Sequence, residues 1–329
     1  MPLRRSLLTL GASACLLALA PLAPAVAQAQ AFPARTVRLV LPQPPGTGPD
    51  TLTRALAEEL GKDLGQPFVV DNRPGANGAL AAAHVIGQPA DGHTVFVAGV
   101  SNLAWNPYLY KKLGYRPERD FVGVAMLAES PFITVVAPQL GVRTLAELVS
   151  RAKAQPGRLD FASAGIGNST HLATELLMQR TGIQLQHVPF GGAAGSSFYT
   201  SLMQGDTPVM TSVASDIVPL SREGRVVPLA VTGNKRLAPL PEVPTFQELG
   251  IDMDVPGWYA MVARSGTAPA VIARLNTAVN KALNTPRVRE MLAAQFLEPR
   301  AGAASEVERL TRRDAQTWGP IIERLEIAK

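Results

Sequence analysis

Short apolar runs alternate with longer amphipathic stretches along most of this chain. The runs are rich in Val and bounded by Gly, Pro or Asp, a pattern typical of buried parallel strands. The stretches between them place apolar residues at helical spacing, as Leu52, Leu56 and Leu60 do. Strands are expected at residues 37–41, 68–70, 94–98, 122–127, 133–137, 186–190, 208–212, 226–231 and 259–263. This alternation predicts an α/β fold with open, mostly parallel sheets, and the chain length indicates two such domains.

Three helices are expected to begin with a capping box, in which a Ser or Thr oxygen caps a backbone amide and a Glu side chain reaches back. The matching segments are residues 144–147, 245–248 and 305–308. From Pro269 onward the pattern is almost entirely helical, which fits helices that wrap back over a sheet.

The N-terminus has the pattern of a secretory signal peptide. Arg4 and Arg5 precede an apolar run over residues 7–20, and small residues of the A-x-A type follow. Cleavage is expected after Ala27 or Ala29, so that residues 1–27 are a leader and the mature chain is exported. The alternative, an uncleaved anchor, is disfavoured because the run is shorter than the ~20 residues of a membrane span. Both the general secretory and the twin-arginine route stay open.

Removing this leader changes the composition. The full chain of 329 residues carries 31 basic residues, 26 acidic residues and a single cysteine, Cys15. Loss of Arg4 and Arg5 leaves 29 basic residues against 26 acidic ones, a net charge of +3, and Cys15 is lost with them. The mature chain therefore has no disulfide scaffold and no thiolate metal cluster. Nucleic-acid binding is disfavoured because no basic stripe with interleaved aromatic residues occurs.

Two loops between a strand and a helix have the composition of a ligand site. The first, residues 42–50, contains Gly46, Thr47, Gly48 and Asp50. Its glycines let the backbone approach a ligand closely, and the following helix would point its amides at that ligand. An ordinary strand-to-helix turn is the alternative interpretation of this loop.

The second loop, residues 163–171, combines two glycines with small hydroxyl and amide side chains. Such a loop is a neutral cradle for a carboxylate. It does not match the dinucleotide pattern G-x-G-x-x-G, because Thr170 stands where the last glycine belongs, so nucleotide binding is disfavoured. A third segment, residues 189–197, repeats the order of strand, glycine turn and helix.

Patterns of catalytic residues are missing from the sequence. No G-x-S-x-G elbow occurs, and the four histidines show no H-E-x-x-H spacing. His171 is the one histidine at a loop–helix junction. We therefore expect a binding protein without catalytic residues, bound metal or cofactor, and a secreted α/β enzyme acting on a small organic acid is the alternative.

The ordered motifs of the mature chain resemble one family, the periplasmic solute receptors of tripartite tricarboxylate transporters, known as the Bug or TctC family. The resemblance runs from about Phe32 to the C-terminus. Its motifs lie at residues 38–42, 70–78, 91–94, 106–113 with 120–121, 167–172, 188–192, 229–232, 241–245, 257–259 and Trp318.

This resemblance implies two Rossmann-like α/β domains in a type II periplasmic-binding-protein fold with a central ligand cleft. Domain 1 would be discontinuous, combining residues 32–132 with 251–329, and domain 2 would span 133–250. The chain would cross between the domains at residues 133–137 and near Trp258.

The resemblance also implies a function: a monomeric periplasmic receptor that captures a small organic carboxylate. It would deliver this ligand to the membrane permease of a tripartite tricarboxylate transporter, or to a sensor protein. The expected ligand-binding residues are Gly46, Thr47, Gly48, Asp50, Ser101, Gly167, Asn168, Ser169, Thr170, His171, Phe190, Gly191, Gly192 and Asp216. The first loop departs from the family pattern, with Gln43 in place of the usual aromatic residue, so the solute is expected to differ from the common ones.

Overall fold

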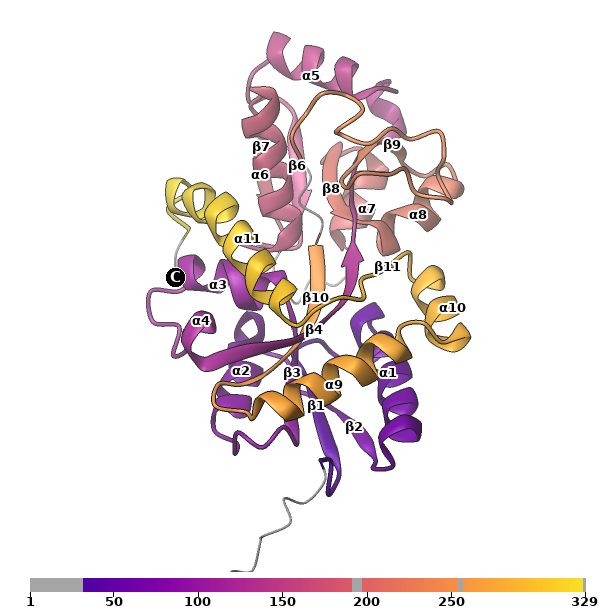
Figure 1. Cartoon of the computed structure of the whole chain (residues 1–329). Coiled ribbons are helices and arrows are strands. Elements are labelled where there is room, and N and C mark those ends of the chain that lie inside the picture. Colours follow the sequence, from indigo (N-terminus) through magenta and orange to yellow (C-terminus); the bar gives the residue numbers. More distant parts are fainter. Residues whose placement is uncertain (1–31, 191–196, 254–256, 328–329) are drawn as a thin grey trace, which may run out of the picture. The chain divides into compact units, whose positions relative to one another are not determined.

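The computed structural model describes residues 32–190, 197–253 and 257–327 (Figure 1). The expected leader, with its cleavage sites and Cys15, lies outside the described residues. Within the described part of the chain, no helix is both long and apolar enough to cross a membrane.

The strands form two sheets, each covered by helices. The six-stranded sheet has the order β11-β4-β10-β3-β1-β2 and the five-stranded sheet the order β7-β6-β8-β5-β9. We call the six-stranded sheet and its helices lobe 1, and the five-stranded sheet and its helices lobe 2. The strands are β1 (Val37–Leu41), β2 (Phe68–Asn72), β3 (Thr94–Gly99), β4 (Phe121–Ser130), β5 (Phe132–Val136), β6 (Asp160–Ser163), β7 (Gln186–Pro189), β8 (Val209–Val213), β9 (Val227–Val231), β10 (Gly257–Arg264) and β11 (Glu298–Pro299).

Helices cover both sheets. Lobe 1 has α1 (Gly48–Leu64), α2 (Ala79–Ile86), α3 (Asn106–Leu109), α4 (Pro117–Asp120), α9 (Pro269–Ala282), α10 (Pro286–Ala294) and α11 (Ser305–Arg324), with the 3₁₀ turn η1 (Ala76–Gly78) and the π-helical turn η2 (Ser101–Trp105). Lobe 2 has the 3₁₀ turn η3 (Pro138–Leu140) with α5 (Leu145–Ala154), α6 (Ser169–Thr181), α7 (Ser197–Gln204) and α8 (Ala214–Arg222).

Both sheets are mixed, so the expectation of mostly parallel sheets was wrong. β1 pairs in parallel with β2 and β3, whereas β10 runs antiparallel to both β3 and β4. In lobe 2, β5 runs antiparallel to β8 and β9. The reason is the chain path, because β4 continues directly into β5 of the other sheet and β10 brings the chain back. As a result, β5 and β10 each run antiparallel to both of their neighbours.

The first crossing between the sheets lies at Pro131, between β4 and β5. It therefore precedes residues 133–137, of which 133–136 belong to β5 of the five-stranded sheet. The return crossing leads into β10, which begins at Gly257 and pairs there with Ser130.

The three expected capping boxes have different outcomes. Thr144 caps α5, because its hydroxyl accepts from the amide of Glu147 at 3.2 Å. Thr245 and Glu248 form both bonds of the box, yet they close a single turn instead of a helix. The third box does not form: α11 begins at Ser305, but Glu308 accepts a hydrogen bond from the amide of Gly123 in β4 at 2.7 Å.

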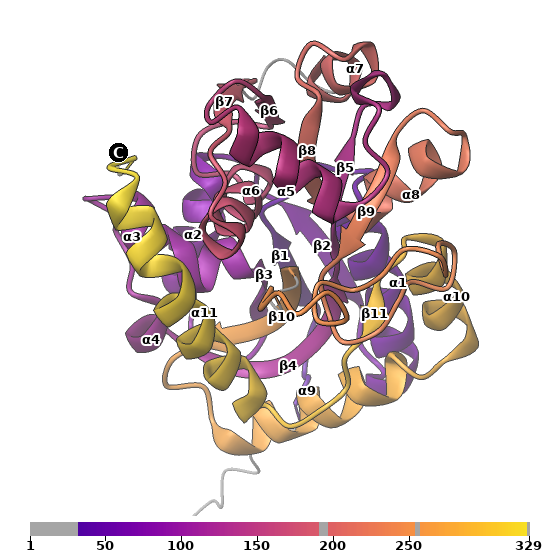
Figure 2. The same ribbon diagram turned by 90° about the horizontal axis from the view of Figure 1, so that it is seen from above.

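Helix α11 joins the two lobes. It packs against β4 and η2 of lobe 1 and also contacts α6 of lobe 2 (Figure 2). Its Trp318 ring packs edge-on against Trp105 with 5.2 Å between the ring centroids, and both side chains are buried. The core consequently continues from lobe 1 into lobe 2 on this side of the molecule.

Candidate functional site

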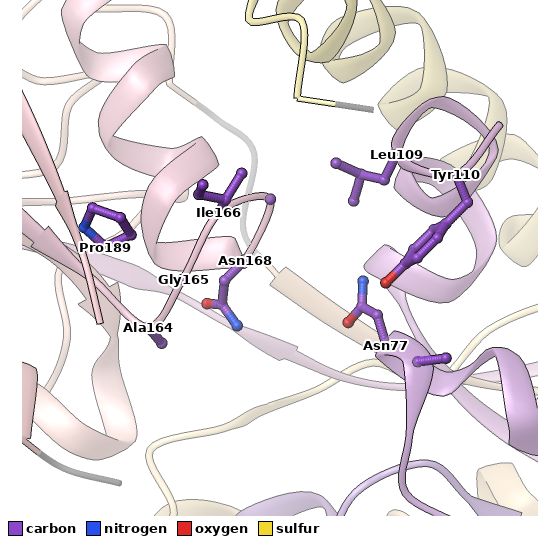
Figure 3. Close-up of a pocket in the computed structure, with 10 residues that line it drawn as sticks. Asn77, Leu109, Tyr110, Ala164, Gly165, Ile166, Asn168 and Pro189 are labelled. Atoms are coloured by element: carbon purple, nitrogen blue, oxygen red, sulfur yellow. The ribbon is translucent and has the colours of Figure 1, made fainter. Parts of the chain in front are cut away.

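A cavity of about 610 Å³ lies where the two lobes face each other. Lobe 1 contributes Ala76, Asn77, Leu109 and Tyr110, and lobe 2 contributes residues 164–168 and Pro189. Figure 3 shows the Asn168 side chain and the Tyr110 hydroxyl directed toward the space between the two sets. None of these described lining residues carries a charged side chain.

The lobe 2 wall is the loop between β6 and α6. Asn168 is the N-cap of α6, and its side-chain oxygen accepts from the amide of Thr170 at 3.1 Å. The hydroxyl of Thr170 in turn accepts from the amide of Ala164 at 2.9 Å, closing the loop on itself. Gly165 and Gly167 have φ values of 131° and 75°, which L side chains rarely adopt. The loop therefore presents the positive end of the α6 dipole to the cavity.

Two stacked histidines, His171 and His187, pack against the side of this loop that faces away from the cavity. The Gly167 amide donates to Nδ1 of His171 at 3.1 Å, and the rings of His171 and His187 stack with centroids 3.9 Å apart. Nε2 of His187 is hydrogen-bonded to the hydroxyl of Ser163, with 2.6 Å between the two atoms. Burial, aided by the neighbouring His171, lowers the pKa of His187 to about 4. His171 itself is 2% exposed and does not line the cavity.

The lobe 1 wall contains two strained residues. Ala76 and Asn77 have φ values of 46° and 48°, in the left-handed region that non-glycine residues seldom adopt. The carbonyl of Asn77 accepts from the side-chain amides of Asn102 and Asn106 at 2.8 and 3.0 Å. Tyr115 joins the same buried network through its hydroxyl, and burial raises its pKa above the ordinary value. This network holds a backbone conformation that would otherwise cost free energy, which is typical of a functional site.

The two walls come close at Gly167 and Leu109. A Cβ atom at Gly167 would lie 2.8 Å from a methyl carbon of Leu109, so only glycine fits there. Tyr110 follows in the chain, and burial raises the pKa of its phenol. The following connection carries Lys111, Lys112 and Arg116, which are exposed.

The loop of residues 42–50 does not line this cavity. Asp50 is 2% exposed, and its carboxylate accepts from the amide of Gly46 at 2.9 Å, from Arg54 at 3.0 Å and from Asn72 at 2.9 Å. Burial opposes ionisation of Asp50, but the hydrogen bonds outweigh it and lower the pKa of the carboxyl. Asp50 therefore organises its own loop, of which Thr47 is the N-cap residue of α1 and Gly48 its first residue.

The other described residues of the expected site are not among the residues that line the cavity. Ser101 begins η2, Ser169 and Thr170 begin α6, and Phe190 packs against the lobe 2 core. Asp216 lies in α8, where its carboxylate accepts from the hydroxyl of Tyr199 at 2.5 Å. Gly191 and Gly192 lie outside the described residues. Of the expected set, Gly167 and Asn168 are among the residues that line the cavity.

Sequence reasoning did not select the lobe 1 wall. Asn77 lies inside the motif at residues 70–78, and Leu109 and Tyr110 lie inside the motif at 106–113. The Asn-Gly pair at residues 77–78 is a typical signal for left-handed backbone, so it could have drawn attention to this turn. No group of three side chains suited to a metal ion occurs in the described part of the chain.

Comparisons with known proteins agree on one family. The model that describes tripartite tricarboxylate transporter family receptors matches residues 52–327. Protein BugT of Bordetella pertussis is 33% identical over 298 residues, which cover 89% of this chain and 90% of BugT.

Solved structures resemble the whole described fold. The R. palustris protein Rpa4515, solved with adipate, superposes with a TM-score of 0.77 at 32% identity, covering 90% of this chain and 99% of that one. MatC of Rhodopseudomonas palustris, solved with bound malate, gives a TM-score of 0.73 at 31% identity, covering 88% of this chain and 100% of that one. The two-domain α/β fold of periplasmic binding proteins is therefore shared by this chain.

Proposed function

This chain belongs to the tripartite tricarboxylate transporter receptor family, and from that premise we propose that it captures a small organic carboxylate between lobes 1 and 2. The observation that carries the proposal is the cavity wall formed by Gly165, Gly167 and Asn168 at the N-terminus of α6. A helix N-terminus attracts an anion through its amides and its dipole. Two structurally similar proteins were solved with adipate and with malate, both dicarboxylates.

The carboxylate is recognised without a cation inside the cavity. Its described lining residues are uncharged, so backbone amides, the Asn77 and Asn168 side chains and the Tyr110 hydroxyl supply the polar contacts. Gly167 and Asn168 are therefore proposed as ligand contacts, together with Ala76, Asn77 and Tyr110. His171 supports the loop of residues 163–168 that meets the solute, whereas Asp50 organises the loop of residues 42–50 outside the cavity.

The two lobes close over the solute. Lobe 1 is one moving body and lobe 2 is the other, and the chain passes between them at Pro131 and ahead of β10. Solute that contacts both walls binds the closed arrangement more tightly than the open one, and this difference in affinity drives closure. The closed form then delivers the solute to the membrane permease of the transporter, or reports it to a sensor protein.

The receptor acts in the periplasm as a monomer. Residues 1–27 direct export and are removed by cleavage after Ala27 or Ala29. Relatives of the same fold include the periplasmic binding protein BugD, which supports this location.

The protein acts as a receptor and not as an enzyme. The contact of Ser163 with His187 resembles part of a hydrolase site, but Ser163 is 0% exposed and its hydroxyl also bonds to the backbone of Gly165. A buried serine occupied in this way cannot reach a substrate carbonyl. Mass spectrometry of each acid after incubation with the protein tests this point, and conversion of the acid would contradict it.

Isothermal titration calorimetry of the purified protein tests the carboxylate. The panel contains adipate, malate and benzoate, with the diamide of adipic acid as the uncharged control. We expect binding of at least one acid and none of the diamide, with a rise in melting temperature on the same acid, since ligand bound to the native state stabilises it. Binding of neutral sugars or of metal cations, with no response to any acid, would contradict the proposal.

A further inference from the structure

Two histidine rings are buried directly beside the wall of the solute cavity. Three nearly parallel rings form a compact group: between ring centroids, His187 lies 4.7 Å from Phe161 and 3.9 Å from His171, and Phe161 lies 6.1 Å from His171. Each histidine holds a different point of the loop of residues 163–168: His171 holds the amide of Gly167, and His187 holds the hydroxyl of Ser163. The loop therefore rests on two imidazoles that do not themselves line the cavity.

The hydrogen bond at Gly167 fixes the protonation state of His171. A backbone amide can only donate, so Nδ1 of His171 must carry a free lone pair. The single ring proton is then on Nε2, which faces the carboxylate of Glu175 at 3.5 Å. A protonated imidazole has no acceptor nitrogen, so protonation of His171 and the bond to Gly167 exclude each other.

His171 accepts a hydrogen bond from the amide of Gly167, the loop residue with the least space for a side chain. Gly167 has a left-handed φ of 75° and abuts Leu109 of lobe 1. The amide of Gly167 shares a peptide plane with the carbonyl of Ile166, so rotation of this plane would move two cavity-lining residues together. The next residue, Asn168, is the cap of α6 and would move with them.

We propose that His171 is a positioning residue of the solute site: its Nδ1 atom holds the Gly167 peptide in the binding conformation, and protonation of the ring releases it. The proposal rests on the proposed function in that the loop is taken as the wall that meets the carboxylate. His171 does not touch the solute. Affinity for the carboxylate therefore depends on the free lone pair of Nδ1.

Among the described residues, few charged or titratable groups surround His171. Its own helix contributes Glu175, and β7 contributes His187. The β6 strand contributes the neutral Phe161 and Ser163, and α11, which packs on α6, contributes Arg324 in the groove that Glu175 also lines. Burial, together with the stacked ring of His171, lowers the pKa of His187.

A pair of substitutions separates the hydrogen bond from simple packing. In His171→Asn, the side-chain oxygen takes the place of Nδ1 on Cγ and accepts from Gly167, although the ring is lost. In His171→Leu, the volume is better filled but the acceptor is lost. We expect His171→Asn to bind the carboxylate within about 3-fold of wild type and His171→Leu about 10-fold more weakly, the cost of one unsatisfied buried donor. A packing role predicts the reverse order, with the smaller Asn causing the larger loss.

A second measurement needs no ligand, so its result does not depend on whether the protein binds a carboxylate. Hydrogen exchange of the Gly167 amide, followed by nuclear magnetic resonance at neutral pH, is expected to be slow in wild type and in His171→Asn and faster in His171→Leu. A wild-type protein that binds no carboxylate but shows this order contradicts the proposed function and leaves the positioning role supported.

The pH profile completes the test. Any fall in wild-type affinity that protonation of His171 causes should be absent from His171→Asn, because an amide side chain does not titrate. Equal Gly167 exchange in both variants, or equal affinities with parallel pH profiles, would overturn the proposal.

Discussion

Replacing Asn168 by Asp places a negative charge at the cavity without removing the helix cap. The side-chain oxygen that accepts from Thr170 remains, and Asp and Asn are equally good N-caps. The substitution therefore changes the electrostatics of the site and leaves the stability of α6 nearly unchanged. A carboxylate solute at the α6 N-terminus would then meet a second carboxylate instead of an amide.

The size of the effect follows from Coulomb's law. Two unit charges about 6 Å apart repel by roughly 0.7 kcal/mol in a water-like dielectric and by roughly 2.8 kcal/mol at an effective dielectric constant of about 20. These limits correspond to losses of about 3-fold and about 100-fold in affinity. Because the cavity is bounded by protein on both sides, we expect a loss of at least about 10-fold at low salt, and part of it should be recovered near 0.1 M salt, where the screening length is about 10 Å.

Calorimetric titration with the best acid of the panel measures this change. Thr144→Asp is the matched control, since Thr144 is the N-cap of α5, lies on an exposed surface and does not line the cavity. It adds the same charge to lobe 2 and should leave affinity unchanged. Asn168→Ser keeps a neutral cap and should also bind. An Asn168→Asp protein that keeps its melting temperature and binds the acid as tightly as wild type would refute the placement of the anion at α6.

Three further outcomes test other parts of the molecule. Gly78→Ala should destabilise the fold by more than about 2 kcal/mol, because the φ of Gly78 is 85° and the added Cβ would lie 2.2 Å from the Asn102 side-chain amide. Gly141 has a φ of 70° but open space around it, so the control Gly141→Ala should cost about 1 kcal/mol. Equal losses of stability in chemical denaturation would contradict the steric argument. The pKa of His187 is lowered to about 4, below the ordinary value of about 6.5, so between these two pH values the folded state binds fewer protons than the unfolded state. The contribution of His187 to stability is therefore complete above pH ~6.5 and is lost as the pH falls toward 4. Over this window, the melting temperature of His187→Gln should fall less than that of wild type. Replacing the exposed Lys111 and Lys112 by Gln should slow association of an anionic solute severalfold in low salt and leave its dissociation rate unchanged. Stopped flow measures both rates, and a change confined to the dissociation rate would show that the two lysines contact the solute.

Much of the fold could be predicted because its signals are local. The short apolar runs locate β1, β3 and β10, and Thr144 marks the start of α5, since strand burial and capping depend on residues within a few positions. Strand direction is different in kind. Whether β10 runs with or against β3 depends on where the chain crosses between two sheets, which no short window contains.

The candidate site divides in the same way. Glycine spacing identified the loop that contains Gly167 and Asn168, because φ restrictions and helix capping act within neighbouring residues. The opposite wall was not found, since Asn77 and Tyr110 lie far away in the chain and meet this loop only through packing of the lobes.

His171 illustrates the limit most clearly. Its place at a loop–helix junction suggested contact with the solute, but the ring is buried and accepts a hydrogen bond from Gly167. By itself, the sequence determined the order of most strands and helices, the glycine-rich loop before α6 and the family to which the chain belongs. Only the tertiary structure decided which face of that loop meets solvent and which meets the imidazoles, because that depends on side chains brought together from β6, β7 and α6.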